Sequence, residues 1–360
     1  MPSSKNISSA PAPTAPLSIR QEDPLASNTW DELISPQPDS SIFHRTAWAN
    51  VLAQTYGFTP LYLSAHCDQK PVAALPLLEI DSWLTGKRGV ALPFTDECQT
   101  LGCSETFRAP LVAEALRLGR NRGWKYLELR GGENLFNGAA PSIVFYGHRV
   151  KLSAATDSLF ERFESSVRRA LRKSEKNGVR VEFSQTLQAT AEYYVLHCQT
   201  RKAHGLPPQP FHFFRRIHEH ILAPNLGVIV TAKQADQPVA SAIFFHHGRT
   251  ALYKFGASIK AALDLRANNL VMWEAMKWLA ARGVEELNFG RTSVHNEGLR
   301  RYKLGWGAEE YLINYYRYDL RADAVVPVQD ESAGWYNALF RALPVPLARR
   351  AGEILYRHAA

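Results

Sequence analysis

A glycine- and cation-rich stretch near residue 300 carries side chains that could do chemistry. Residues 287–309 read LNFGRTSVHNEGLRRYKLGWGAE, in which Arg291, Ser293 and Lys303 follow a short apolar run. Fixed donors of this kind can bind an anion or stabilise a negative charge that develops during a reaction. The alternative is a solvated loop whose glycines and hydroxyls only shape a turn. The stretch therefore supports two hypotheses, an anion site and a surface loop.

A second group of cations lies in residues 167–178, VRRALRKSEKNG. Arg168, Arg172 and Lys176 are spaced four apart and would form one stripe along a helix. The opposite, apolar face would comprise Phe160, Phe163, Val167 and Leu171. Because like charges at this spacing repel, the stripe favours an anion such as a substrate diphosphate, transfer RNA or an acidic lipid head group. A solvated basic face is the alternative.

Two further side chains are candidates from their position after or within strands. Tyr253 alternates with Phe255 and Ala257, so we expect these three residues to share one face of a sheet. There Tyr253 would shape an acceptor pocket or relay a proton, or it is a half-buried strand aromatic. Asp96 follows the strands of the first half and would hold an acceptor amine, or serve only in a turn.

Several other chemistries lack the residues they need. His212, His218 and His220 lie close in sequence, but they form neither a His-Glu-x-x-His pattern nor part of a Cys/His quartet, so no metal site is expected. Neither a serine nucleophile elbow nor a glycine-rich nucleotide loop is present. The four cysteines lack CxxC spacing, which is typical of a reducing compartment.

The composition sets the scale of the molecule and the charge of its partners. With 360 residues, 46% of them apolar, the chain can form two domains with their own cores. Its net charge of +8 favours phosphorylated substrates, nucleic acid or an acidic membrane face. No stretch reaches the roughly 18 apolar residues of a membrane span. Residues 1–25 contain no signal-peptide core, and we expect a disordered tail there.

An internal repeat predicts the elements that must position these residues. DQKPVAALPLLEI (68–80) resembles DQPVASAIFFHH (236–247), and APLVAEALRLGRNRGWKYLELRGG (109–132) resembles NLVMWEAMKWLAARGVEELNFGRT (269–292). The two matches occur in the same order and at nearly the same offset, which indicates a duplication. Each copy predicts an antiparallel meander, a long helix that ends at Arg-Gly, and a further strand.

Further blocks connect this repeat to a known family. They are SIFHRTAWANVLAQTYGFTPLYL (41–63), LPFTDECQTLG (92–102), VRRALRKSEKNGVRVEF (167–183), FGAS (255–258), ANNLVMWEAMKW (267–278), LNFGRTS (287–293) and YKLGWGAE (302–309). Together they make residues 40–320 resemble the Fem-type (FemAB-like) peptidoglycan aminoacyltransferases. More narrowly, the chain is similar to the Fem-like proteins of Gram-negative bacteria that accompany exopolysaccharide and protein-sorting (PEP-CTERM/exosortase) loci.

The resemblance implies a fold and its domains. The fold would be mixed α/β (α+β), a tandem duplicated GNAT-like acyl-CoA N-acyltransferase fold with two mixed-sheet domains and helices on their faces. The expected domains are residues 26–155 and 156–325, followed by a basic amphipathic segment over 326–360. Within that segment, residues 335–359 either lie on an anionic membrane or pack back on the protein.

The resemblance also implies roles for individual residues. Lys303 matches the family's lysine before a Gly-aromatic-Gly segment and would stabilise the oxyanion or bind substrate phosphate, with Arg291 and Ser293 on the cleft floor. Members that use coenzyme A bind its pyrophosphate on a glycine-rich turn at a helix N-terminus. Here that turn contains Arg266 and Asn268 and no glycine. Arg266 could meet a phosphate and Asn268 could cap the helix, but a coenzyme A donor fits less well.

The function these observations favour is transfer of an activated acyl or aminoacyl group to an amine or hydroxyl of a cell-envelope or exopolysaccharide precursor. The donor would be aminoacyl-tRNA or acyl-CoA, with no bound cofactor. The acceptor would be an anionic small molecule or a lipid-linked saccharide, reached from the cytoplasm or from the inner face of the cytoplasmic membrane. The alternative is a catalytically inactive GNAT-like binding module that docks polysaccharide-synthesis proteins or anionic membrane.

Overall fold

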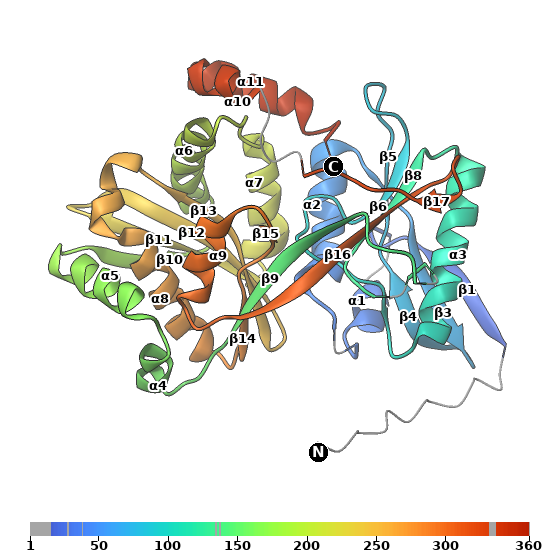
Figure 1. Ribbon diagram of the computed structural model, residues 1–360, viewed down its shortest axis with the longest axis horizontal. Helices are drawn as coiled ribbons and strands as arrows, with labels where there is room; N and C mark the ends of the chain where they lie inside the picture. The colour runs from blue at the N-terminus through green and yellow to red at the C-terminus, as the bar shows by residue number, and fades with distance from the viewer. Residues whose placement is uncertain are drawn as a thin grey trace.

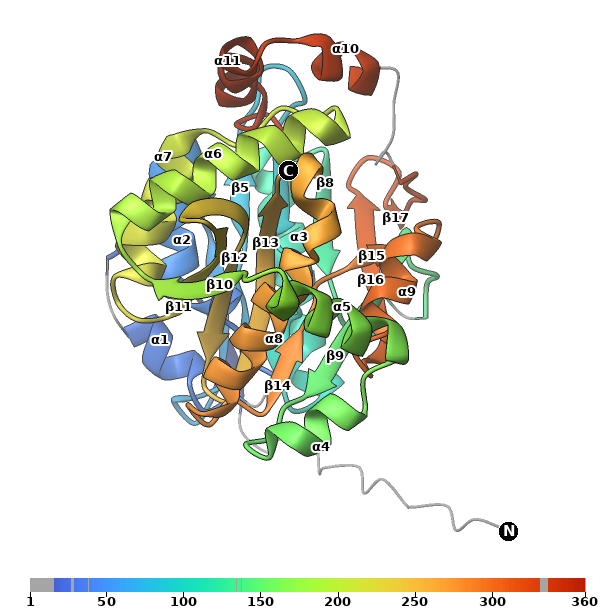
Figure 2. The same ribbon diagram turned by 90° about the vertical axis from the view of Figure 1, so that its left-hand side faces the viewer.

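The computed structural model describes residues 16–26, 29–37, 39–133, 135–136, 138–330 and 336–359. Two α/β halves lie side by side, joined by long strands that run through the middle of the molecule (Figure 1). Figure 2 shows the second half from the side, with helices on both faces of its sheet. No helix in these ranges is long and apolar enough to cross a membrane.

The first half contains short strands, two long helices and a few brief turns of helix. Its elements are β1 (Leu17–Glu22), α1 (Thr29–Ile34), the 3-10 helix η1 (Ile42–His44), α2 (Thr46–Tyr56), β2 (Thr59–Pro60), β3 (Tyr62–Cys67), β4 (Lys70–Leu75), β5 (Leu78–Ile80), β6 (Arg88–Ala91), β7 (Leu101–Gly102), α3 (Glu105–Arg122) and β8 (Tyr126–Arg130).

The second half begins at a long strand and ends in a helical pair. Its elements are β9 (Ile143–Lys151), α4 (Thr156–Glu161), α5 (Ser165–Lys176), β10 (Arg180–Ser184), α6 (Leu187–His204), α7 (Phe211–Ile217), η2 (His218–Leu222), β11 (Gly227–Gln234), β12 (Gln237–His247), β13 (Thr250–Ser258), η3 (Lys260–Leu265), α8 (Ala267–Ala280), β14 (Glu286–Asn288), β15 (Thr292–Ser293), α9 (Glu297–Leu304), β16 (Glu309–Asp319), β17 (Ala324–Val325), α10 (Tyr336–Ala342) and α11 (Val345–Leu355).

The duplication predicted from the sequence is present in the structure. Hairpin β3–β4 turns at Asp68 and Gln69 with φ of 49° and 65°, and hairpin β11–β12 turns at Ala235 and Asp236 with φ of 45° and 63°. Two consecutive positive φ angles are typical of the type I′ turns that join antiparallel strands. Each long helix then leads to a strand that pairs in parallel with an earlier one, β8 with β6 and β14 with β13.

The halves are joined by the strands β9 and β16, which pair with each other in the middle of one sheet. In the described residues thirteen strands form one sheet, in the order β10-β11-β12-β13-β14-β9-β16-β8-β6-β5-β2, with β15 beside β9 and β17 beside β16. Strand β9 pairs with β14 of the second half, whereas β16 pairs with β9 and then with β8 of the first half. Strand pairing therefore crosses the boundary predicted at residue 155, and one hydrogen-bonded sheet runs through both halves.

Helices of the first half also pack on the second half. Trp48 of α2 is fully buried, and its ring lies 6.1 Å from that of Phe213 of α7 and 6.0 Å from that of Phe245 of β12. Burying large aromatic side chains supplies much of the free energy that holds such surfaces together. The seam is therefore rigid enough to position side chains from both halves around one site.

The two ends of the chain differ from the sequence-based expectation. The disordered tail predicted for residues 1–25 is wrong for Leu17–Glu22, which forms β1 and pairs with β3 because its alternating side chains add an edge strand. Residues 1–15 lie outside the described ranges, as does Trp335. At the other end, α10 and α11 pack against α6. This contact is the packing alternative proposed for residues 335–359, although it leaves one face of α11 exposed.

Candidate active site

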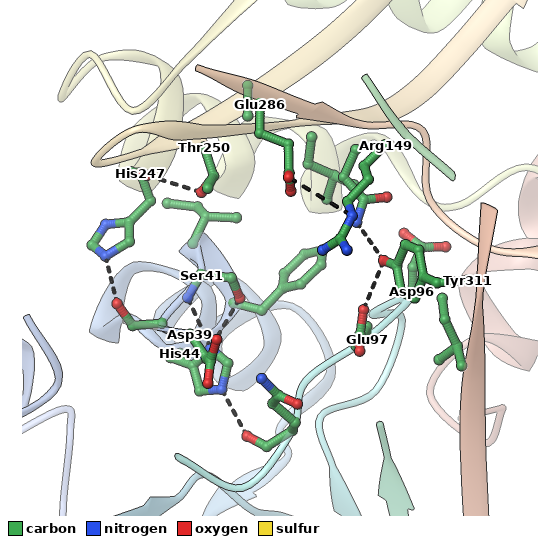
Figure 3. A pocket seen from close by; sticks show the side chains of 18 of the residues that line it. Asp39, Ser41, His44, Asp96, Glu97, Arg149, His247, Thr250, Glu286 and Tyr311 are labelled. Atoms are coloured by element: carbon green, nitrogen blue, oxygen red, sulfur yellow. Dashed lines mark hydrogen bonds and ion pairs between the residues drawn. The ribbon is translucent and has the colours of Figure 1, made fainter. Parts of the chain in front are cut away.

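A cavity of about 1010 Å³ lies at the seam between the two halves. Side chains from both halves face it: Ser41, His44 and Asp96 on one side, Thr250 and Glu286 on the other (Figure 3). The first group comes from η1, the residue before it and the loop after β6, and the second from the adjacent first residues of the parallel strands β13 and β14. Such a concave space with converging polar groups is the usual place for a substrate.

The wall of this cavity is acidic on balance. Its carboxylates and cations among the described residues are Asp39, Asp96, Glu97, Glu133, Glu285, Glu286, Arg108, Arg149, Lys151 and Arg249. Two of the cations are already paired on the wall, Arg249 with Glu285 and, at 3.9 Å, Arg149 with Glu286. An acidic wall favours a ligand that carries an amine or many hydroxyls, although the chain as a whole is basic.

Asp96 and Lys254 form an ion pair at the floor of this cavity. Lys254 Nζ lies 2.9 Å from Asp96 Oδ2, and the two side chains are 7% and 22% exposed. Gly290 lets a loop lie against the carboxylate, because a Cβ there would come 3.2 Å from Asp96 Cγ. Burial raises the pKa of Asp96, but Lys254, Arg291 and Lys303 more than offset it, so the pKa is lowered. Asp96 thus remains a carboxylate able to hold an amine.

Lys254 reaches Asp96 because of a β-bulge. Between β12 and β13, Ile243 pairs with Phe255 and Phe244 pairs with Tyr253, so Lys254 is the extra residue of the bulge. The expectation that Tyr253, Phe255 and Ala257 share one face is therefore wrong. Tyr253 packs with the α8 side of the sheet, whereas Phe255 and Ala257 pack with the core on the other side.

A second carboxylate, Glu97, stands at the start of a hydrogen-bonded chain on the same wall. Tyr311 Oη donates to Glu97 Oε2 at 2.9 Å, and Asn288 Nδ2 donates to Tyr311 Oη at 2.8 Å. Burial raises the pKa of Glu97, while the Tyr311 hydroxyl and the charge of Arg149 reduce the shift without cancelling it. Glu97 is therefore the more basic of the two adjacent carboxylates.

His44 is a buried, neutral imidazole in the wall of the cavity. Its Nδ1 accepts from the backbone N–H of Ser41 at 3.1 Å, so the proton resides on Nε2, which donates to the carbonyl of Gln99 at 2.9 Å. Burial is the main reason that the pKa of His44 is lowered to about 4. The imidazole is therefore uncharged at neutral pH and serves to fix the shape of the wall.

Lys303, the residue expected to stabilise an oxyanion, is buried in the structure. Only 3% of it is exposed, and its Nζ donates to the carbonyls of Gly290 at 2.8 Å and Arg291 at 3.1 Å. It lines neither of the two cavities described. Its contacts hold the turn between β14 and β15 in place, and its charge lowers the pKa of Asp96. The geometry makes Lys303 a positioning residue.

Burial lowers the pKa of Lys303 to about 8 from its ordinary 10.5. The unfolded chain then binds more protons than the folded one between these values, so Lys303 contributes stability above about pH 10.5 that is lost as the pH falls through 8. At roughly 1.4 kcal/mol per tenfold change in proton affinity, the contribution is about 3 kcal/mol. Urea unfolding of the wild type and of Lys303→Met across this pH range should differ in slope; parallel curves would contradict the prediction.

The remaining predicted residues of the 287–309 stretch lie away from the cavities. The Arg291 guanidinium stacks on the rings of Phe145, at 4.4 Å, and Tyr315, at 5.3 Å. Ser293 pairs with Phe145 in the β15–β9 ladder, and its hydroxyl accepts from the N–H of His295 at 3.3 Å. These contacts are turn and packing interactions, as in the surface-loop hypothesis.

A smaller cavity of about 370 Å³ opens at the N-terminus of α8. Tyr253, Arg266 and Asn268 line it, which brings together three of the predicted residues. Asn268 does not cap the helix, because its Nδ2 donates to Ser258 Oγ at 3.1 Å. Arg266 stands at the cap with a left-handed φ of 56°, the conformation that glycine would adopt most easily. The turn is thus formed without glycine and presents a guanidinium instead.

Gly256 allows Tyr253 to occupy this smaller cavity. A Cβ at Gly256 would lie 1.7 Å from Tyr253 Oη, so Gly256→Ala must displace the ring. We expect a loss of about 1–3 kcal/mol in the free energy of unfolding. Thermal and urea unfolding measure this loss. Gly298→Ala is the matched control, because a Cβ there meets nothing closer than 3.8 Å; equal effects of the two substitutions would refute the steric account.

The basic stripe of α5 lies outside both cavities. Arg168 is partly exposed and Arg172 exposed, and in the described ranges neither forms an ion pair. Val167 and Leu171 are buried against α8 as predicted. Phe160 belongs to α4 and Phe163 to the following turn, so the predicted apolar face is formed by two helical segments. The structure leaves the α5 stripe as an exposed cationic surface.

Sequence reasoning missed Lys254, Glu97 and Tyr311. Lys254 could have been noticed as a charged residue inside an otherwise apolar strand, but its direction depends on the bulge. Glu97 follows Asp96 directly, and no local pattern distinguishes their roles. Tyr311 reaches Glu97 only because β16 returns to the first half.

Comparison with known proteins agrees with this geometry. Residues 161–311, which contain every residue lining the smaller cavity, match the family model described as "Acetyltransferase (GNAT) domain". No curated protein matches the sequence. Among solved structures, FemX superposes with a TM-score of 0.65 at 13% identity, covering 85% of this chain and 98% of its own.

Two other structures show the same arrangement over most of the chain. The C-terminal domain (DUF2156) of a putative lysylphosphatidylglycerol synthetase from Agrobacterium fabrum has a TM-score of 0.53 at 15% identity and covers 87% of this chain and 95% of its own. A tandem GNAT protein from the clavulanic acid biosynthesis pathway has a TM-score of 0.54 at 11% identity, with coverage of 88% and 100%. The chain therefore has a tandem GNAT fold, with the match to the acetyltransferase family model in its second half.

Proposed function

We propose that this protein is an acyltransferase that moves an activated acyl or aminoacyl group from a donor in the smaller cavity to an amine or hydroxyl of an acceptor in the larger one. The observation that carries the proposal is strand β13. Its first residues, Thr250 to Leu252, line the larger cavity, and Tyr253 and residues 256–258 line the smaller one. The bulge at Lys254 lies between these two sets of residues, so one strand contributes residues to both cavities.

The reacting groups would be divided between the two cavities. Asp96 holds the ammonium of the acceptor, and Glu97, the more basic carboxylate, takes a proton from it. The neutral amine then attacks the donor carbonyl carbon, and the bond from that carbon to the donor's oxygen or sulfur breaks. The leaving group takes the surplus proton from the nitrogen and departs as an alcohol or thiol. Positioning of the two ligands supplies much of the rate.

Tyr253 would stabilise the oxyanion of this reaction. Burial raises the pKa of Tyr253 to about 12, so its hydroxyl stays protonated at neutral pH. Throughout the described residues this hydroxyl has no hydrogen-bond partner, and it faces the smaller cavity. A buried donor aimed at a developing negative charge lowers the barrier of acyl transfer.

The donor and the acceptor are proposed by chemical class. A FemX structure and a lysylphosphatidylglycerol synthetase domain are among the similar folds, which supports an aminoacyl donor such as aminoacyl-tRNA, with acyl-CoA as the other candidate. The guanidinium of Arg266 would meet a donor phosphate. The acidic wall of the larger cavity supports an amine-bearing acceptor, which we propose is a cell-envelope or exopolysaccharide precursor, either a free nucleotide sugar or a lipid-linked saccharide.

A transfer assay with purified protein tests the proposal. Each reaction contains one labelled donor, either aminoacyl-tRNA or acetyl-CoA, and one acceptor, either a uridine-diphosphate muramyl peptide or an amino sugar. Transfer of label with any pair, reduced in Tyr253→Phe and unchanged in Gly298→Ala, supports it. The turn without glycine favours the alternative, a binding module without activity. Tight binding of acceptor with no transfer from either donor class would establish that alternative and refute ours.

A further inference from the structure

One end of the molecule exposes large apolar side chains on two separate elements. In the loop between β5 and β6, Trp83 is 84% exposed and Leu84 is 54% exposed. On α11, Leu347 is 52% exposed and Ile354 is 61% exposed. Single exposed apolar residues are common, but a cluster that includes a largely exposed tryptophan marks an interaction surface.

The β5–β6 loop contacts His358, three residues after the end of α11, so these side chains lie at one surface. Ser82 Oγ lies 2.9 Å from His358 Nδ1, and the ring of Trp83 lies 5.4 Å from that of His358. Arg88 Nη2 donates to the carbonyl of His358 at 2.8 Å. Figures 1 and 2 both show the β5–β6 loop and α11 projecting at the same end of the molecule.

One face of α11 packs against the rest of the protein, and the opposite face is exposed. Ala348 and Gly352 are buried, and a Cβ at Gly352 would lie 2.0 Å from the carbonyl oxygen of Pro208. Leu347, Arg350 and Ile354 recur at helical spacing on the opposite face, where all three are exposed. The close packing of Ala348 and Gly352 therefore fixes the orientation of α11 and keeps its apolar outer face exposed.

Exposed cations lie in the same C-terminal segment as Leu347 and Ile354. Arg341, Arg350 and Arg357 are exposed, and none of them forms an ion pair within residues 336–359 or with the rest of the described chain. By contrast, the Arg349 guanidinium lies 5.2 Å from the centroid of the Tyr194 ring and belongs to the packed side. The outer surface thus combines insertion-prone apolar groups with unneutralised positive charge.

We propose that this surface, formed by Trp83, Leu84, Leu347, Arg350 and Ile354 and flanked by Arg341 and Arg357, docks on an anionic phospholipid bilayer. Tryptophan is favoured at the boundary between head groups and acyl chains, and the leucine and isoleucine side chains can enter that boundary while the arginines remain at the phosphates. A second copy of the chain is a poorer occupant, because a symmetric contact would bring the same arginines together.

Vesicle flotation of the full chain tests this surface directly. We expect binding to vesicles that contain phosphatidylglycerol and a partition coefficient on the order of 100-fold lower for pure phosphatidylcholine, since each of three arginines contributes about a factor of five. Arg350→Gln with Arg357→Gln should remove most of that difference. Equal binding to both kinds of vesicle, or no binding to either, would overturn the proposal.

Substitutions of the apolar side chains test whether these side chains enter the bilayer or whether binding is only electrostatic. Trp83→Ser combined with Ile354→Ser should weaken binding at least about tenfold, because each exposed side chain loses its apolar burial in the bilayer. Leu25→Ser is the matched control, because Leu25 is 43% exposed in the turn between β1 and α1 and should have no effect. Anionic vesicles should also shift tryptophan emission to shorter wavelength in the wild type and not in Trp83→Ser. A concentration-dependent dimer abolished by the same variants, without vesicle binding, would assign the surface to a second copy and refute the lipid.

Discussion

Replacing Lys254 with methionine is expected to lower the free energy of unfolding by about 3 kcal/mol, because it removes the ammonium that is paired with the half-buried Asp96 carboxylate. The two side chains are 7% and 22% exposed, and the pair is 2.9 Å long. Methionine has nearly the length of lysine, so the loss of charge is separated from the loss of volume. Urea unfolding followed by circular dichroism measures the change.

The control for this prediction removes the charge of both partners. The double variant Lys254→Met with Asp96→Asn should recover most of the stability, because it also removes the Asp96 charge that lost its ion-pair partner. Lys277→Met is a comparison at a more exposed pair, because Lys277 lies 2.7 Å from Glu274 but is 36% exposed, and it should cost no more than about 0.5 kcal/mol. Equal costs at Lys254 and Lys277 would show that the seam pair is not shielded from water.

The sequence was informative about the halves of the fold. The repeat predicted two hairpins and two helix-strand units, and both hairpins turn through a pair of positive φ angles. These features depend on residues close in the chain, where periodicity and turn chemistry act locally. The exchange of β9 and β16 across the seam depends on pairings between residues more than 130 apart, such as Glu286 with Lys151, and no local pattern specifies them.

The candidate site could be predicted only in part, because local sequence patterns locate some of its residues but do not specify how distant strands pair. Asp96 and Tyr253 were found from their places after and within strands, and both line a cavity. Lys303 was expected at a cavity, but its short helix α9 places its ammonium against the carbonyls of Gly290 and Arg291. The direction of Tyr253 depends on a single inserted residue in β13, and periodicity assumes that no such insertion occurs.

Total charge was a poor guide to the ligand of the larger cavity. The chain carries +8, yet the seam is lined by more carboxylates than cations. The excess cations lie instead on α5 and on α11, where Arg172 and Arg350 are exposed. A protein that handles an amine-bearing acceptor near an anionic surface would need both kinds of region, separated in this way.

Glu97→Gln is expected to reduce kcat by about 100-fold or more, because general bases typically accelerate reactions by at least that factor. The change in KM should be smaller. Activity of the wild type should fall as the pH drops through the pKa of Glu97, which burial places above its ordinary value of 4.5. Glu133→Gln is the matched control, because Glu133 lies on the same cavity wall but is exposed. Its kcat should remain within about threefold of the wild type.

Tyr311→Phe distinguishes a base from a carboxylate that only shapes the wall. The hydroxyl of Tyr311 donates to Glu97 at 2.9 Å and lowers its pKa, so its removal should raise that pKa further. The acid limb of the pH profile of kcat should then move to higher pH in Tyr311→Phe and vanish in Glu97→Gln. A structural role would lower kcat at all pH values and leave the limb where it was, and that result would assign the proton to another group.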